Sequence, residues 1–259
     1  MQTVVDDIVV TRHPLGTPHE ALAARLAAAA SDPLRTLYAA PLADHPITAP
    51  NGQLLTLAPR TEPLPMDEEP PWQEAGRLLA HLHRTPPPPG LPEHGGHSYL
   101  QVAVDAASGL HPGGATDILR ELGASLLAQW PDPPRPSVVH GDWDLGNLGR
   151  LPGTTTWLLT GPETLGLGDP GWDLGRPAGL WAAGLLDDAS WRALLRGYAE
   201  AGGVIPHEGE AWNALEHPAR CAVFTATVRE VGRSGASEPR TELADTLLEA
   251  CVKMNGRRW

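Results

Sequence analysis

The segment that begins at Ser137 and reads SVVHGDWDLGN constrains this chain more than any other part of it. Its first residues favour a short strand, and a polar turn with a glycine follows directly. The turn carries the imidazole of His140 and the carboxylate of Asp142, and the amide of Asn147 comes five residues later. A carboxylate there can accept the proton of a substrate hydroxyl, and an amide oxygen can bind a magnesium ion that bridges phosphates. The pattern therefore brings together residue types that suit proton transfer and metal binding.

A second element follows at residues 165–174 and reads LGLGDPGWDL. Together the two elements resemble the catalytic loop and the later Gly-Asp-Pro element of the aminoglycoside phosphotransferase and choline kinase-like (APH) family. The resemblance is specific over residues 137–178, and the rest of the chain follows the family in the order and character of its elements. It implies a protein-kinase-like fold, with Asp142 as the catalytic base and Asn147 as a metal ligand.

The residues themselves leave plainer roles open. Asp142 would also suit a turn, because an aspartate side chain bonds readily to nearby backbone N–H groups. His140 is a catalytic candidate beside Asp142, and a packed, hydrogen-bonded core histidine is the alternative. Within the family, Asp169 and Asp173 are expected to brace the catalytic loop and to cap the next helix.

The chain departs from the family at the metal site. The family places its principal magnesium aspartate at the end of the strand before the Gly-Asp-Pro element. That position here is Gly161, whose missing side chain offers no ligand. Glu163 is the nearest carboxylate and is therefore the candidate replacement as a metal ligand.

The phosphate-binding cation is changed as well. A kinase holds the nucleotide phosphates with a strand lysine that pairs with a helix glutamate, whereas this chain has one lysine, Lys253. In the candidate strand, Thr11 or Arg12 falls where the lysine is expected. Arg12 is then the candidate phosphate ligand, and Glu20 in the following helix is its candidate partner. No glycine-rich turn precedes this strand in the sequence.

Three functions follow as alternatives. The first is a degenerate kinase, or pseudokinase, with impaired binding of ATP and magnesium, which uses the cleft between its lobes for a small-molecule or peptide ligand, a partner or a repurposed reaction. The second is an active phosphotransferase that acts on the hydroxyl group of a small molecule or peptide, with Mg²⁺ and ATP or GTP as cofactors and Asp142 as the base. The third is an enzyme that needs no nucleotide and uses Asp142 and His140 for acid–base chemistry.

The expected fold class is α+β, with two lobes of the protein-kinase type. Residues 1–62 form a truncated, β-rich N-lobe without the glycine-rich loop, and residues 63–259 form a larger helical C-lobe with the catalytic-loop motif. The N-lobe elements expected are a strand at 4–10, a helix at 17–30 capped by Thr17, a strand at 37–42 and a hairpin at 47–57 that turns at Asn51-Gly52. Apolar periodicity predicts later helices at 72–83, 99–107, 116–130, 178–186, 188–201, 209–232 and 238–254.

Composition narrows the class of partners and the compartment. The formal net charge of −12 opposes binding to nucleic acids, which requires a basic surface. No apolar run is long enough to cross a membrane. Cys221 and Cys251 do not form a disulfide framework and fit a reducing cytoplasm. A truncated sheet would leave one edge strand exposed, so a homodimer that pairs through the N-lobe is expected.

Histidines outside the motif form a weaker pattern. His81 and His83 share one helix, while His94 and His97 lie in a glycine-rich stretch. A zinc site built from these side chains is one alternative. Solvated or capping histidines are the other.

Overall fold

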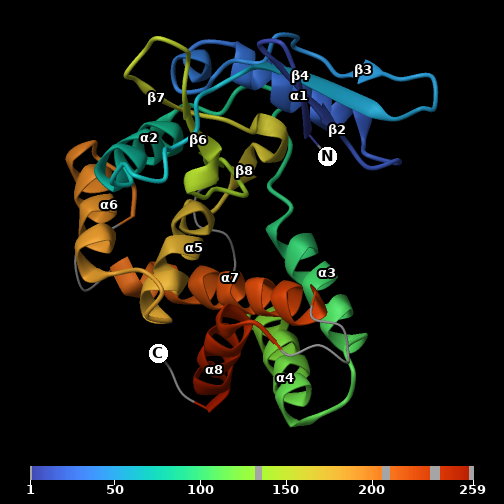
Figure 1. Ribbon diagram of the computed structural model, residues 1–259, viewed down its shortest axis with the longest axis vertical. Coiled ribbons are helices and arrows are strands. Elements are labelled where there is room, and N and C mark those ends of the chain that lie inside the picture. Colours follow the sequence, from blue (N-terminus) through green and yellow to red (C-terminus); the bar gives the residue numbers. More distant parts are fainter. Residues whose placement is uncertain (1, 132–135, 206–210, 234–239, 257–259) are drawn as a thin grey trace. The chain divides into compact units, whose positions relative to one another are not determined.

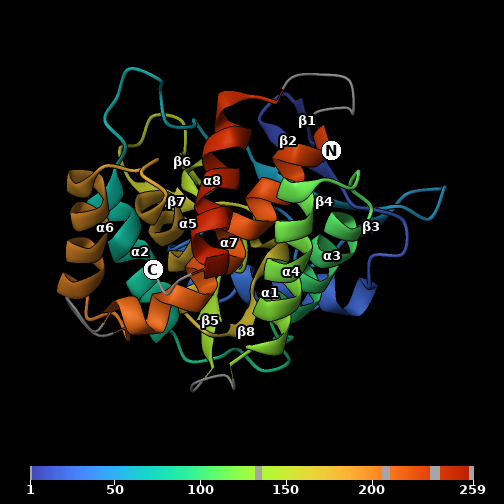
Figure 2. The same ribbon diagram turned by 90° about the horizontal axis from the view of Figure 1, so that it is seen from below.

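The computed structural model describes residues 2–131, 136–205, 211–233 and 240–256 (Figures 1 and 2). A small antiparallel sheet comes first and a mainly helical part follows, which confirms the α+β class. Two compact units are present: the first comprises Met1–His94, Arg135–Pro170 and Ala193–Val204, and the second comprises the remainder. The lobe boundary between residues 62 and 63 stays a prediction, because these units divide the chain along other lines. The first unit contains all six candidate site residues, which are Arg12, Glu20, His140, Asp142, Asn147 and Glu163.

The first unit opens with a four-stranded sheet in the order β1-β2-β4-β3. Its strands are β1 (Gln2–Val5), β2 (Ile8–Arg12), β3 (Ile47–Thr48) and β4 (Leu54–Pro59). The single strand expected at 4–10 is wrong, because a turn at Asp6 and Asp7 divides it and Val5 pairs with Ile8. Asp6 has a φ of 53°, and aspartate enters the left-handed region more readily than most residues. The result is an antiparallel β1–β2 hairpin.

The hairpin expected at 47–57 is confirmed as β3–β4, and Gly52 in its turn has a φ of 80°, a conformation that favours glycine. The expected helix is also confirmed, as α1 (His19–Ala30). Its N-cap is Pro18, however, and the Thr17 hydroxyl donates instead to the Pro14 carbonyl at 2.8 Å. Thr17 therefore stabilises the turn before the helix, and its expected capping role is wrong.

The strand expected at 37–42 does not form. A short 3₁₀ helix, η1 (Leu34–Thr36), comes first, and Tyr38 then makes an isolated bridge to Leu159. The Leu159 N–H donates to the Leu37 carbonyl and the Ala39 N–H donates to the Leu159 carbonyl, both at 2.8 Å. The segment meets β7 (Trp157–Leu159) at this one bridge, so Tyr38 and Ala39 are buried without forming a regular ladder.

The motif region of the first unit consists of two small antiparallel pairs, β5–β8 and β6–β7. Its elements are β5 (Ser137–Val139), η2 (Leu145–Asn147), β6 (Leu148–Arg150), β7 (Trp157–Leu159), η3 (Pro162–Thr164) and β8 (Gly166–Gly168). Helix α2 (Trp72–Arg84) packs against β5 and against the second half of α6 (Asp188–Glu200). Gly76 and Gly197 allow this approach, because a side chain at either position would meet the backbone of the facing helix.

The second unit is helical. It contains α3 (Gly96–Ser108), α4 (Gly114–Ala128), α5 (Gly171–Ala182), α7 (Ala211–Arg233) and α8 (Glu242–Gly256). Its core gathers apolar side chains of α3, α4, α7 and α8 around the fully buried Phe224. The helix expected at 178–186 begins earlier, at Gly171, and runs through Pro177. Gly175, two residues before this proline, packs closely against Pro218 of α7.

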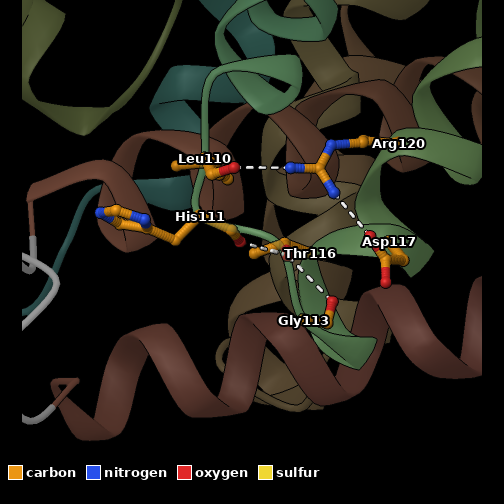
Figure 3. Close-up of polar contacts among 6 residues, drawn as sticks. All are labelled: Leu110, His111, Gly113, Thr116, Asp117 and Arg120. Carbon is orange, nitrogen blue, oxygen red and sulfur yellow. Dashed lines mark hydrogen bonds and ion pairs between the residues drawn. The ribbon is translucent and has the colours of Figure 1, made fainter.

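The start of α4 shows how a helix begins without a side-chain cap (Figure 3). The Thr116 hydroxyl shares its one hydrogen between the carbonyls of His111 and Gly113, and Arg120 donates to the Leu110 carbonyl and pairs with Asp117. These bonds tie the preceding turn to the first turns of the helix. The expected first residues of the last two helices, 209 and 238, lie outside the described residues. Among the described helices, none has both the length and the apolar character of a membrane span.

Candidate functional site

The catalytic-loop motif begins where β5 ends. His140 is 1% exposed, and its Nε2–H donates to the Thr160 carbonyl at 2.7 Å. Its ring stacks on Tyr38 with 6.0 Å between the ring centroids. The hydrogen bond joins the catalytic loop to the residue directly before Gly161, so His140 links the two halves of the candidate site. This environment matches the core role that the sequence left open.

The next residues form a constrained turn. Gly141 has a φ of 89°, which glycine adopts more easily than any other residue. The Thr164 hydroxyl donates to the His140 carbonyl at 2.9 Å, and the His94 ring donates to the Gly141 carbonyl at 3.0 Å. Asp142 follows with an exposed side chain. The loop therefore presents this carboxylate to solvent from a firmly held backbone.

The polar residues that follow form a capping box around η2. The Asp144 carboxylate accepts the Gly146 N–H at 2.7 Å, and the Asn147 side-chain oxygen accepts the Asp144 N–H at 3.0 Å. Such reciprocal bonds satisfy N–H groups at the start of the helical turn. Asn147 is therefore part of the scaffold, and the second lone pair of its oxygen is what a metal ion would use.

Gly161 lies beside Asn147. A β-carbon at Gly161 would stand 3.1 Å from Asn147 Nδ2 and 3.7 Å from Glu163 Oε2. Gly161 itself is in the left-handed conformation and starts η3, whose turn carries Glu163 back toward it. The amide and the neighbouring carboxylate thus converge on the place where a side chain at 161 would lie. Sequence alone could not show that Glu163 turns back in this way.

Glu163 is also tied to the sheet. Thr56, which is buried in β4, donates its hydroxyl hydrogen to Glu163 Oε1 at 2.9 Å. The ring of His13 lies 3.1 Å from the same hydroxyl oxygen, and because a hydroxyl has one hydrogen, His13 must be the donor there. Burial lowers the pKa of His13, the nearby Glu163 raises it, and the N-terminal charge lowers it again.

Arg12, one of the two nucleotide-side candidates, points away from this array. Successive side chains of a strand point to opposite faces, so Arg12 and His13 diverge. Arg12 Nη1 donates to the Thr3 hydroxyl at 3.4 Å, whereas His13 reaches Thr56. Glu20 is exposed in the first turn of α1. The structure therefore brings Asn147, Gly161 and Glu163 together. It also places His13, which the sequence did not single out, beside Thr56 on the sheet face that contacts Glu163.

The remaining expectations have mixed outcomes. Asp173 was expected to cap the next helix, but it lies within the first turn of α5 and is fully buried. The described residues contain no cluster of three or more histidine, cysteine, aspartate or glutamate side chains that could hold a metal ion. His94, expected to be solvated or a cap, instead contacts the catalytic loop.

Comparisons with known proteins agree with this geometry. The model of the phosphotransferase enzyme family (APH) matches residues 2–216. A choline/ethanolamine kinase family protein from Mesorhizobium loti has a similar fold, with a TM-score of 0.62 and 20% identity over 99% of this chain and 85% of that one. An aminoglycoside-3'-phosphotransferase of type VIII gives a TM-score of 0.59 and 17% identity over 87% and 93% of the two chains.

A spectinomycin phosphotransferase in complex with ADP and spectinomycin gives a TM-score of 0.58 and 11% identity over 97% and 87% of the chains. A search of curated protein sequences found no match. Identities this low establish the fold, and the family model, which spans most of the chain, establishes the membership. The chain belongs to the phosphotransferase enzyme family, with the kinase-like fold of its relatives.

Proposed function

We propose that this chain is a degenerate member of its family, a pseudokinase in which binding of ATP and magnesium is impaired. The observation that carries the proposal is Gly161, which stands beside Asn147 where a principal metal carboxylate would be needed. Magnesium binds through oxygen ligands and favours carboxylates. Without one at this position, the remaining groups bind the metal-nucleotide complex weakly.

The phosphate side supports the same proposal. Arg12 lies on the face of β2 away from Glu163, and His13 takes the facing position with a lowered pKa. A neutral imidazole is a poor substitute for a lysine, because it does not balance phosphate charge. The site then keeps its fold and its exposed Asp142 for a small-molecule or peptide ligand, a protein partner or a repurposed reaction.

A second candidate is an active phosphotransferase that transfers phosphate from ATP or GTP to a hydroxyl group. The convergence of Glu163 and Asn147 on Gly161 favours it, because Glu163 Oε2 is not the oxygen that Thr56 engages. Glu163 Oε2 and the second lone pair of Asn147 Oδ1 would hold Mg²⁺, and Asp142 would accept the proton of the substrate hydroxyl. The spectinomycin phosphotransferase relative binds ADP, which supports a nucleotide as the phosphate donor in this case.

The third candidate, acid–base chemistry by Asp142 and His140 without nucleotide, has less support. His140 is buried and its Nε2–H is engaged by the Thr160 carbonyl. A general base must reach the proton that it removes, and the exposed Asp142 meets that requirement better than His140 does.

Isothermal titration of the protein with ATP and GTP, with and without Mg²⁺, tests the proposal. We expect no saturation up to millimolar nucleotide under either condition. Saturable binding that needs Mg²⁺ would favour the active phosphotransferase, and Asp142→Asn would then abolish transfer while leaving nucleotide binding in place. Turnover of a substrate without any nucleotide would favour the third candidate.

We further infer a cytoplasmic protein that pairs into a homodimer through β1. This strand lies at the edge of the sheet and all four of its residues are exposed. Val4 and Val5 are each 54% exposed, and an exposed apolar edge strand readily pairs with another chain. The two cysteines are free and buried, which suits a reducing compartment. Sedimentation of a monomer at all concentrations from micromolar upward would rule out the homodimer.

A further inference from the structure

His94 lies where the two family motifs meet. Residues 92–94 run beside β8: the His94 N–H donates to the Leu167 carbonyl at 2.7 Å, and the Leu167 N–H donates to the Pro92 carbonyl at 2.9 Å. These bonds extend the β5–β8 pair by a third, very short segment. The backbone of His94 is therefore held in place by the second motif, and its side chain is directed from there.

Three glycines of the two motifs leave room for this histidine. A β-carbon on Gly141 would stand 2.7 Å from His94 Cδ2, and one on Gly168 would stand 2.9 Å from His94 Cβ. A β-carbon on Gly166 would stand 2.9 Å from the His94 nitrogen. Such distances are shorter than ordinary carbon contacts, so any larger residue at these positions would displace His94.

The imidazole reaches the first motif through a hydrogen bond. His94 Nε2 lies 3.0 Å from the Gly141 carbonyl oxygen, and since a carbonyl can only accept, the ring must be protonated at Nε2. Gly141 directly precedes Asp142, and Gly168 directly precedes Asp169. One side chain thus touches the backbone immediately before an aspartate in each motif.

We propose that His94 is a positioning residue, which holds the Gly141 peptide so that Asp142 projects correctly, and which couples that turn to the end of β8 before Asp169. It acts through the backbone and does not itself touch a reacting group. The role is independent of the metal ligands, and it applies equally to a loop that binds a ligand and to a loop that transfers phosphate. Small errors in the placement of a reacting group cost rate steeply, which gives such a residue its value.

A matched pair of variants separates positioning from packing. Gln and Met have similar volumes, but only Gln can present an N–H near the place of His94 Nε2. In His94→Met we expect the amide resonances of Asp142 and Asp169 to shift and broaden together in ¹⁵N–¹H spectra of the protein without nucleotide. In His94→Gln they stay near their wild-type positions, while resonances in the remote Gly52 turn change in neither variant.

The wild-type protein gives a second measurement that needs no variant. Ring ¹⁵N shifts of labelled histidine report the tautomer, and His94 must show the Nε2–H form. A wild-type Nδ1–H tautomer, or equal disturbance of Asp142 in the Gln and Met variants, would overturn the proposal. If the wild type transfers phosphate, kcat falls at least about tenfold in His94→Met with an unchanged KM for nucleotide. Because the spectra use protein without nucleotide, a failed nucleotide titration bears on the proposed function and leaves this test intact.

Discussion

The catalytic loop and the sheet face that carries Thr56 differ in which of the expected phosphotransfer residues they contain. The loop carries His140, Asp142 and Asn147, while the nucleotide side has Gly161 beside Asn147 and His13 beside Thr56. The loop residues are also the ones that the fold uses, because His140 ties two segments together and Asn147 completes a capping box. Retention of the motif is therefore explained in part by folding, and by itself it is weak support for catalysis.

The largest expected effect concerns the backbone of the loop. In Gly141→Ala, the β-carbon would stand 2.5 Å from the Thr164 carbonyl oxygen at a φ of 89°. We expect the free energy of unfolding to fall by about 3 kcal/mol, the sum of left-handed strain and overpacking. Gly153→Ala is the control, because Gly153 also has a positive φ of 75° but open space around it. It should cost about 1 kcal/mol in denaturant titrations, and equal losses in the two variants would contradict the tight packing of the loop.

Substitutions on the nucleotide side should cost less stability than those in the catalytic loop. The buried Thr56 is an exception. Thr56→Val removes the donor to Glu163 and the acceptor for His13 while keeping the shape of the side chain. We expect a loss of about 1–3 kcal/mol in the free energy of unfolding. Thr56→Ser keeps the hydroxyl and should retain most of the stability that Thr56→Val loses. A Thr56→Val variant as stable as the wild type would show that the bonds of Thr56 with Glu163 and His13 contribute nothing to stability.

Restoring the missing carboxylate sharpens the comparison between the two sides. Asp tolerates the left-handed conformation of Gly161, so Gly161→Asp should raise the affinity for magnesium-ATP at least about tenfold, or ~1.4 kcal/mol. Gly161→Asn has nearly the same shape without the charge and is the matched control. If titration shows no gain for Asp over Asn, the weak step lies in the phosphate-binding groups.

The pH dependence of stability should also distinguish the regions. The folded-state pKa of His13 lies below the ordinary value of 6.5, chiefly because burial disfavours the charged ring. The unfolded chain therefore binds the proton more readily, and stability that is complete above pH 6.5 is lost as the pH falls below it. His13→Gln keeps a donor for Thr56 and should flatten the slope between pH 5 and 7 in denaturant titrations.

Part of that slope should remain in His13→Gln, because His217 in the second unit also has a pKa lowered by burial and by Arg220. A wild-type protein whose stability is constant from pH 5 to 7 would contradict the lowered pKa of both rings. An unchanged slope in His13→Gln alone would assign the effect to His217.

The smallest effect is expected at Arg12. Its guanidinium donates to Thr3 in an exposed contact, so Arg12→Ala should change the free energy of unfolding by no more than about 0.5 kcal/mol. Nucleotide titrations should be unaffected, since the side chain lies on the face of β2 away from Glu163. A marked loss of nucleotide affinity in this variant would restore Arg12 as the phosphate ligand and would argue against the degenerate site.

Local features of the sequence determined the fold class, the order of the motifs, the hairpin at Gly52 and the helix α2, because turn chemistry and apolar periodicity act over a few residues. Points where an expected strand or helix is interrupted were harder to predict. The Asp6 turn divided one expected strand, and α5 continued through Pro177.

Tertiary structure alone decided which side chains meet. Arg12 ends β2 and contacts Thr3, whereas His13, the next residue, donates its N–H to the Leu54 carbonyl and its ring meets Thr56. The turn of η3 brings Glu163 to Gly161, and pairing beside β8 places His94 against a loop 47 residues away in the chain. The sequence by itself determined that a phosphotransfer motif is present. Contacts between remote segments decided which groups surround it, because no local pattern records them.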